Sequence, residues 1–201
     1  MYNFKNILLE RSEQVTSQKN NLIDLFLSPD RTVKRYIIGK NDESSAVLNN
    51  GIIDGVIDDM ALPGSTWLGI PCVKMSSIEK DSIVVNCSTS ISPVAVIKSL
   101  KKSGLNSVIN YANLVNYSSA FSKPWFVIEM EKSLSQNDLE WNELYEKLAD
   151  DESKAILESV ALFRLTADPS IMEQFSVRLS DQYMEDFMCF KNEKFVDVGG
   201  V

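Results

Sequence analysis

The sequence contains no histidine. This excludes a serine–histidine–aspartate triad, a cysteine–histidine dyad, a histidine general base and almost every zinc site built from the usual ligands. Cysteine is also scarce, with three residues: Cys72, Cys87 and Cys189. They are odd in number, far apart in the sequence and flanked by apolar residues. This pattern is typical of reduced, mostly buried thiols in the cytosol and not of a disulfide framework.

Long apolar segments are missing as well. No run reaches the roughly 18 apolar residues that a membrane span requires, and the N-terminus turns polar before the core of a signal peptide develops. We therefore expect a soluble, cytoplasmic protein. Basic residues are outnumbered by acidic ones, 20 against 28, and the net charge of −8 disfavours nucleic acid as a partner. Trp67, Trp125 and Trp141 are accordingly expected to be core or interface anchors and not platforms for bases.

What the chain does have is a globular composition. It contains 201 residues, of which 44% are hydrophobic and 24% are charged. This length suits one domain or two small ones with a sizeable core.

Short apolar segments alternate with helical ones in the first half of the chain. Strands are predicted at residues 35–39, 52–57, 70–73, 82–86 and 107–109, and helices at 45–48 and 93–102. Such alternation is typical of a parallel sheet with helices on its faces. We therefore predict an α/β fold: a Rossmann-like, mostly parallel sheet with flanking helices, followed by a helical connector.

The second half of the chain has a helical texture. Ser135 opens an S-x-x-D cap before a charged helical stretch, and Asp150 can cap a second helix that ends at Asp168-Pro169. The inward face of that second helix is predicted to be Ile156, Val160 and Phe163. Just upstream, Glu129 and Glu131 alternate along a strand-like stretch. The expected organisation is a helical segment at 1–29, the α/β domain at 30–120, the connector at 121–192 and a further strand at 193–201.

Polar residues follow each predicted strand of the α/β domain. Because the carboxyl ends of parallel strands meet at one edge of a sheet, a ligand site is predicted there. Its members are the following residues: Gly39, Asn41, Asp58, Asp59, Asn86 and Ser88. Adjacent acids accept hydroxyl donors and repel a bare phosphate, so a sugar or ribose is favoured. A G-x-G-x-x-G sequence is absent, and the competing interpretation is a degenerate domain kept for packing or docking.

The amino-acid sequence of the second half resembles that of the FkbM-type S-adenosylmethionine-dependent methyltransferases. The resemblance covers about residues 130–201 and rests on four elements in order: Leu-Tyr-Glu-Lys-Leu-Ala-Asp-Asp-Glu-Ser-Lys at 144–154, Phe-Arg-Leu-Thr-Ala-Asp at 163–168, Asp181-Gln-Tyr183 with Phe187, and Glu-Lys-Phe-Val-Asp-Val-Gly-Gly at 193–200. The stretches at 51–59 and 69–73 also resemble the sugar-nucleotide-associated N-terminal domains of bacterial sugar-modifying enzymes.

By this resemblance Asp197, Gly199 and Gly200 match the first cofactor motif, whose backbone would contact the methionine part of S-adenosylmethionine. The third glycine, the helix and the ribose-binding acid of the motif do not follow in this sequence. We therefore expect an N-terminal portion of such an enzyme, which neither binds the cofactor tightly nor transfers a methyl group by itself. The parent reaction methylates a hydroxyl of a glycan or secondary metabolite.

The alternative is a non-enzymatic module that binds a sugar nucleotide or glycan precursor, or that docks onto a protein such as a second copy of the chain.

Overall fold

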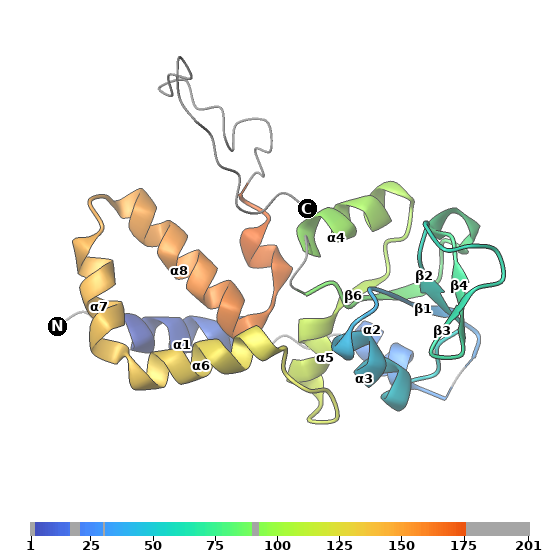
Figure 1. The fold of residues 1–201 in the computed structure, drawn as a ribbon, viewed down its shortest axis with the longest axis horizontal. Coiled ribbons are helices and arrows are strands. Elements are labelled where there is room, and N and C mark those ends of the chain that lie inside the picture. Colours follow the sequence, from blue (N-terminus) through green and yellow to red (C-terminus); the bar gives the residue numbers. More distant parts are fainter. Residues whose placement is uncertain (1–2, 17–20, 30, 90–92, 176–201) are drawn as a thin grey trace, which may run out of the picture.

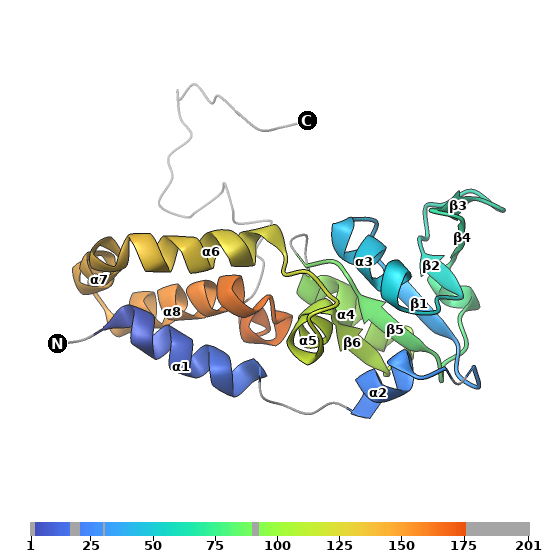
Figure 2. The ribbon, with the colours of Figure 1, turned by 90° about the horizontal axis from the view of Figure 1, so that it is seen from below.

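The computed structural model describes residues 3–16, 21–29, 31–89 and 93–175, and the following account concerns these residues. They form two parts that lie side by side, a sheet flanked by helices and a bundle of helices (Figures 1 and 2). None of the described helices is both long enough and apolar enough to cross a membrane.

The sheet has six strands in the order β3-β4-β2-β1-β5-β6. In chain order the strands are β1 (Arg35–Ile38), β2 (Gly55–Ile57), β3 (Thr66–Trp67), β4 (Ile70–Val73), β5 (Ile83–Asn86) and β6 (Val108–Asn110). All neighbouring pairs are parallel except β3 and β4, which form an antiparallel hairpin at one edge. This confirms the prediction of an α/β fold with a mostly parallel sheet and flanking helices.

Helices cover both faces of the sheet because side chains alternate along each buried strand. Ile37 and Val85 pack in one core with α2 (Asn21–Leu27), α3 (Asp42–Asn50) and α5 (Tyr111–Tyr117). Val84 and its half-buried neighbour Ile38 lie in a second core, to which α4 (Pro93–Lys102) contributes Leu100. The predicted helix at 93–102 thus has the expected bounds, whereas α5 was not predicted.

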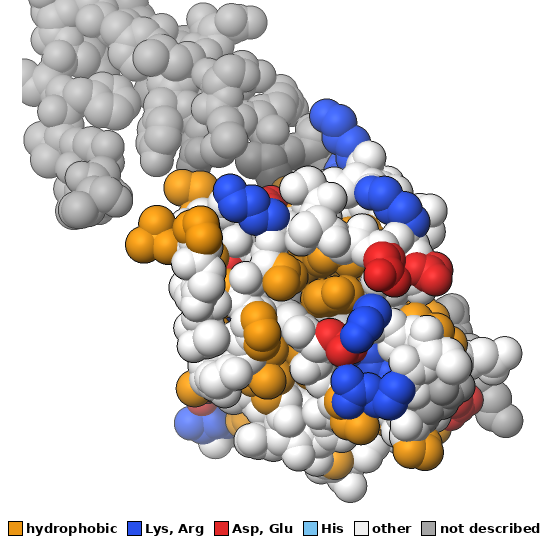
Figure 3. All heavy atoms as spheres, turned by 90° about the vertical axis from the view of Figure 1, so that its right-hand side faces the viewer, with side chains coloured by type: hydrophobic (Ala, Val, Ile, Leu, Met, Phe, Trp, Pro, Cys, Tyr) orange, Lys and Arg blue, Asp and Glu red, His pale blue; other side chains and the backbone are white. Residues whose placement is uncertain are grey.

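The β3–β4 hairpin protrudes at the outer edge of the sheet (Figure 2). Figure 3 faces this end of the molecule and shows hydrophobic side chains spread over it among charged ones. Met60, Leu62 and Leu68 are the most exposed of the large hydrophobic residues in this segment, at 90%, 77% and 65%. Leu68 occupies the tight turn of the hairpin with φ of +49°.

The helical part consists of α1 (Phe4–Thr16), α6 (Trp125–Gln136), α7 (Asp138–Lys147) and α8 (Asp151–Thr166). The expectation of a strand-like stretch around Glu129 and Glu131 is wrong, because both residues belong to α6 and are exposed there. The inward positions of α6 are Phe126, Val127, Met130 and Leu134, which recur at the period of a helix.

The predicted inward face of α8 is also wrong in part. Ile156 and Val160 are 42% and 37% exposed, and the inward positions are instead the following residues: Ser159, Ala161, Leu162, Leu165 and Thr166. Phe163 is half-buried and stacks on Phe126, with ring centroids 5.9 Å apart. The helix begins after Asp150, which accepts a hydrogen bond from the backbone N–H of Ser153, as the sequence predicts.

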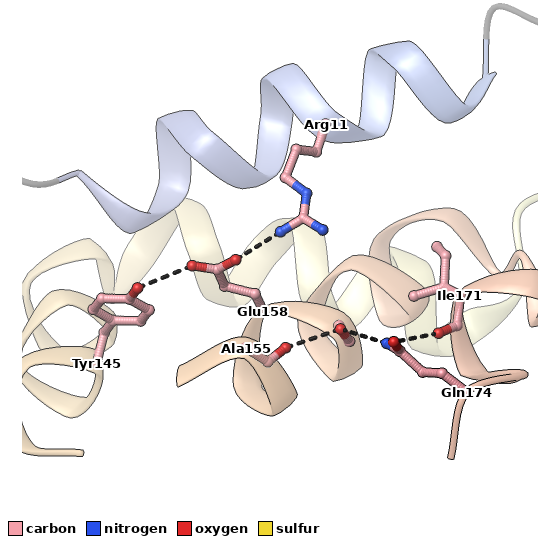
Figure 4. Close-up of polar contacts among 7 residues, drawn as sticks. Arg11, Tyr145, Ala155, Glu158, Ile171 and Gln174 are labelled. Carbon is pink, nitrogen blue, oxygen red and sulfur yellow. Dashed lines mark hydrogen bonds and ion pairs between the residues drawn. The ribbon is translucent and has the colours of Figure 1, made fainter. Parts of the chain in front are cut away.

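A polar network joins three helices of the bundle (Figure 4). Arg11 of α1 donates to Glu158 of α8 over 2.6 Å, and Tyr145 of α7 donates its hydroxyl to the other oxygen of the same carboxylate over 3.0 Å.

The first helical segment contributes to both parts, because α1 packs in the bundle while α2 packs on the sheet. The domain boundaries themselves remain a prediction.

Candidate functional site

The strand order reverses beside β1. From β1 the chain runs outward to β2 and β4, and it then crosses to β5 and β6 on the other side of β1. The parallel strands thus follow the order of doubly wound nucleotide-binding sheets, in which ligands lie in the crevice beyond the carboxyl ends of the two strands at the reversal. Here those ends are Ile38 and Asn86, which are register partners.

The loops that follow β1 and β5 touch each other closely. Gly39 has φ of +109°, and a Cβ there would lie 3.2 Å from the carbonyl carbon of Cys87 and 3.3 Å from the nitrogen of Ser88. Asn41 donates from Nδ2 to the carbonyl oxygen of Cys87 over 2.8 Å. Its Oδ1 accepts from the backbone N–H of Ser44 over 3.0 Å and so caps α3. We call these contacts between the loops after β1 and β5 the floor of the crevice.

Asn86 serves the loop that leaves β5. Its side chain donates to the carbonyl oxygen of Pro93 over 3.3 Å and accepts from the N–H of Ser88 over 3.1 Å. With only 2% of its surface exposed, Asn86 is better placed to fix this loop than to touch a ligand directly.

The two acids after β2 have different partners. Asp58 forms an ion pair with Lys40 and accepts from the backbone N–H of Met60 over 2.9 Å. Asp59 accepts from the backbone N–H of Met75 over 2.8 Å, where a short 3₁₀ helix begins. The hydrogen bond from Lys40 holds the pKa of Asp58 below its usual value, and the same bond raises the pKa of Lys40. Both groups stay charged at neutral pH.

The structure thus arranges the predicted site residues as two neighbouring groups. Gly39, Asn41, Asn86 and Ser88 form the floor at the end of β1 and β5. Asp58 and Asp59 follow β2, which is adjacent to β1, and Lys40 connects the two groups. Sequence reasoning missed Lys40, although its position directly after Gly39 in a turn beside two acids was a usable signal.

A cleft of about 320 Å³ adjoins the floor at Asn41. It is lined by the start of α3 and by the segment that leads into α6, with the following residues: Asn41, Asp42, Glu43, Ser122, Lys123, Pro124, Trp125 and Ile128. Apart from Asn41, none of these residues was predicted to belong to a site, because the two walls come from distant parts of the chain. Trp125 is 65% exposed and is therefore no core anchor.

The described residues of this edge do not fit S-adenosylmethionine. The turn after β1 carries one glycine, and its polar groups bond within the chain: Asn41 donates to the carbonyl oxygen of Cys87, and the hydroxyl of Ser44 donates to the carbonyl oxygen of Gly39 over 2.8 Å. The residues that the resemblance assigns to the cofactor, Asp197, Gly199 and Gly200, lie outside the described residues.

Other chemistry at this edge is limited. Burial raises the pKa of the Cys87 thiol to about 12, so this thiol stays protonated at neutral pH and is a poor nucleophile. Cys72 is half-buried, and Cys189 lies outside the described residues. Within the ranges that the structure describes, no group of three or more histidine, cysteine, aspartate or glutamate side chains is arranged to hold a metal ion.

Gly39→Ala is expected to destabilise the protein by about 1–3 kcal/mol through backbone strain alone, with a further cost from the close contact to the Cys87–Ser88 backbone. Gly64→Ala is the matched control, because Gly64 has φ of +78° but a Cβ there meets nothing within 4 Å. Urea unfolding of both variants measures the difference. Equal losses for the two variants would show that the turn after β1 yields easily and that the floor of the crevice is not fixed.

Comparisons with known proteins support the fold and no more. No protein-family model matches the sequence, and no curated protein is significantly similar to it. Among solved structures, the chain is similar to the methyltransferase FkbM from Methylobacillus flagellatus KT, with a TM-score of 0.53 and 15% sequence identity. The match covers 93% of this chain and 55% of that one, so the chain spans about half the length of the protein it resembles. At this identity the likeness shows a shared fold.

Proposed function

We propose that the α/β part recognises a sugar nucleotide or a related glycan precursor at the carboxyl edge of its sheet. The observation that carries this proposal is the reversal of strand order beside β1, with Lys40, Asp58 and Asp59 at the same edge. Ligands of doubly wound sheets bind at this position.

The charged side chains at this edge suit a ligand with hydroxyl groups. Carboxylates accept hydrogen bonds only, and the lowered pKa of Asp58 keeps it ionised at neutral pH. Lys40 supplies a positive charge that a diphosphate group can share with Asp58, and lysine commonly binds phosphate in this way. Two acids and a net charge of −8 oppose a bare phosphate, so the hydroxyls of the ligand provide the specificity.

This recognition is proposed to serve methyl transfer. The similarity in fold to an FkbM methyltransferase and the motifs at 144–154 and 163–168 support a role as the N-terminal portion of such an enzyme. In this role the described residues bind the acceptor or its nucleotide-linked precursor, and the methyl group of S-adenosylmethionine goes to a hydroxyl of a glycan or secondary metabolite. The free thiols Cys72 and Cys87 are consistent with a cytoplasmic location.

The alternative is a docking module whose partner is a second copy of the chain. It is favoured by the exposure of Met60, Leu62 and Leu68 at the outer edge of the sheet. Residues 60–73 carry no charge in a protein of net charge −8, so charge repulsion between two copies is weak across this segment.

Uridine diphosphate glucose at millimolar concentration is expected to shift the NMR signals of Lys40, Asp58 and Asp59. The double variant Asp58→Ala, Asp59→Ala should weaken binding about tenfold or more, since each tenfold corresponds to about 1.4 kcal/mol. Removal of the hydrogen bond from Met75 to Asp59 is expected to lower stability by about 1 kcal/mol without unfolding the protein.

The matched control is Glu79→Ala, Asp81→Ala. It removes the same charge from the segment before β5, at the opposite edge of the sheet, and should leave the affinity within about twofold of the original. If the sugar nucleotide shifts none of these signals and sedimentation shows a dimer, the docking module is the better description. Equal weakening in both double variants would mean that a general loss of structure, and not this edge, accounts for the change, because removal of negative charge by itself favours an anionic ligand.

A further inference from the structure

The cleft between α3 and α6 has two unlike walls. One wall is the first turn of α3, with Asp42 and Glu43, and the other is the first turn of α6, with Trp125 and Ile128. The cleft measures about 320 Å³, and it shares Asn41 with the floor of the crevice. A ligand at the carboxyl edge of the sheet can therefore extend into it.

Trp125 faces the cleft because of its place on α6. The inward stripe of this helix is Phe126, Val127, Met130 and Leu134, which leaves Trp125 and Ile128 on the outer side. They are 65% and 51% exposed and lie one helical turn apart. An edge-to-face contact with Phe126, at a centroid distance of 6.0 Å, supports the indole ring from one side. Its N–H donates no hydrogen bond within the part of the chain that the structure describes.

The opposite wall presents negative charge. Glu43 accepts from the hydroxyl of Thr89 over 3.1 Å, which fixes this carboxylate, and Asp42 is exposed beside it. The one lysine of the lining, Lys123, forms an ion pair with Glu131 at 2.5 Å, so its charge is already matched. The cleft therefore combines an apolar aromatic face with acceptors for hydrogen bonds.

We infer that this cleft holds the sugar ring of the ligand, with Trp125 as its platform. The C–H face of a pyranose is apolar and stacks on an indole, while its hydroxyls donate to the carboxylates of Asp42 and Glu43. A phosphate is disfavoured by the same two carboxylates, and it belongs nearer to Lys40. This inference rests on the proposed function, because it assigns one part of that ligand to a second group of residues.

The indole N–H signals of the protein give a direct test. The chain has three tryptophans, so three such signals are expected in an NMR spectrum, and Trp125→Phe identifies one of them. Uridine diphosphate glucose should shift the Trp125 signal, whereas uridine diphosphate without the sugar should not. The Trp141 signal serves as the internal control, because its N–H donates to Ser133 over 3.1 Å inside the bundle. A shift of Trp125 with uridine diphosphate alone would mean that the cleft takes the base, which overturns the inference.

Affinities of variants separate this inference from the proposed function. Trp125→Ala should weaken binding of uridine diphosphate glucose about tenfold, and Trp125→Phe, which keeps an aromatic face, about threefold or less. If Asp58→Ala, Asp59→Ala abolishes binding while Trp125→Ala does not change it, the sugar lies elsewhere and only the inference fails. Loss with Trp125→Ala alone would leave the cleft as a sugar site and refute the edge site. Failure of the unmodified protein to bind the sugar nucleotide refutes both.

Discussion

Leu162→Ala is expected to lower the free energy of unfolding by about 2–5 kcal/mol, the usual range for a leucine removed from a packed core. Leu162 is 3% exposed and belongs to the core of the bundle with Phe4, Met130 and Leu134. The loss arises from the apolar contacts removed and from the cavity that remains, because close-packed neighbours relax only in part. Urea unfolding followed by circular dichroism measures it.

Ile156→Ala on the same helix is the matched control. Ile156 is 42% exposed, so its truncation is expected to cost less than about 1 kcal/mol. Both changes remove apolar atoms from α8 and leave alanine, which favours helix, so differences in helix propensity are small. If Ile156→Ala is the more damaging variant, the helix is turned the other way and the face predicted from the sequence is the true one.

The sequence could not decide between these two faces of α8. Ile156, Val160 and Phe163 have helical spacing, but so do Leu162, Leu165 and their neighbours, and a helix that is apolar on both sides gives no preferred direction. The choice is made by partners far away in the sequence: α1 and α6 pack against the Leu162 side. Periodicity carries no information about where such partners lie.

The strands of the sheet were easier to predict because their signals are local. β1, β4 and β5 are short β-branched runs bounded by turn residues, and α4 begins at a proline and is followed by Gly104, where the chain turns with φ of +82°. The hairpin strand β3 has only two residues, too few for any pattern. The helix α6 opens with aromatic and β-branched residues that favour strands, and packing of its inward stripe overrides that preference.

For the candidate site, topology was predictable and side-chain partners were not. Parallel strands must bring their carboxyl ends to one edge, which is why Gly39, Asn41, Asn86 and Ser88 lie together. The sequence does not reveal that Asn86 is occupied with its own loop. Nor does it reveal that Trp125 stands across a cleft from Asp42, because their separation in sequence carries no distance information.

Phe4→Ala is expected to cost about 3–5 kcal/mol, the range for a phenylalanine removed from a core. Phe4 is fully buried, and its ring lies 5.7 Å from that of Trp141 and 5.3 Å from that of Tyr145, measured between centroids. Its backbone N–H donates to the side chain of Asn142 over 2.9 Å. Because one residue of α1 thus contacts α7 at several points, its truncation should also weaken the near-ultraviolet circular dichroism of Trp141.

The control is Leu9→Ala on the same helix, which should change stability by less than about 1 kcal/mol because Leu9 is 40% exposed. A melting temperature unchanged in Phe4→Ala would show that α1 is not docked on α7. The shape of the transition carries further information, because α1 packs in the bundle whereas α2, the next helix, packs on the sheet. If the two parts unfold together, Phe4→Ala shifts a single transition; if the bundle is the weaker unit, the variant splits the curve and the sheet unfolds later.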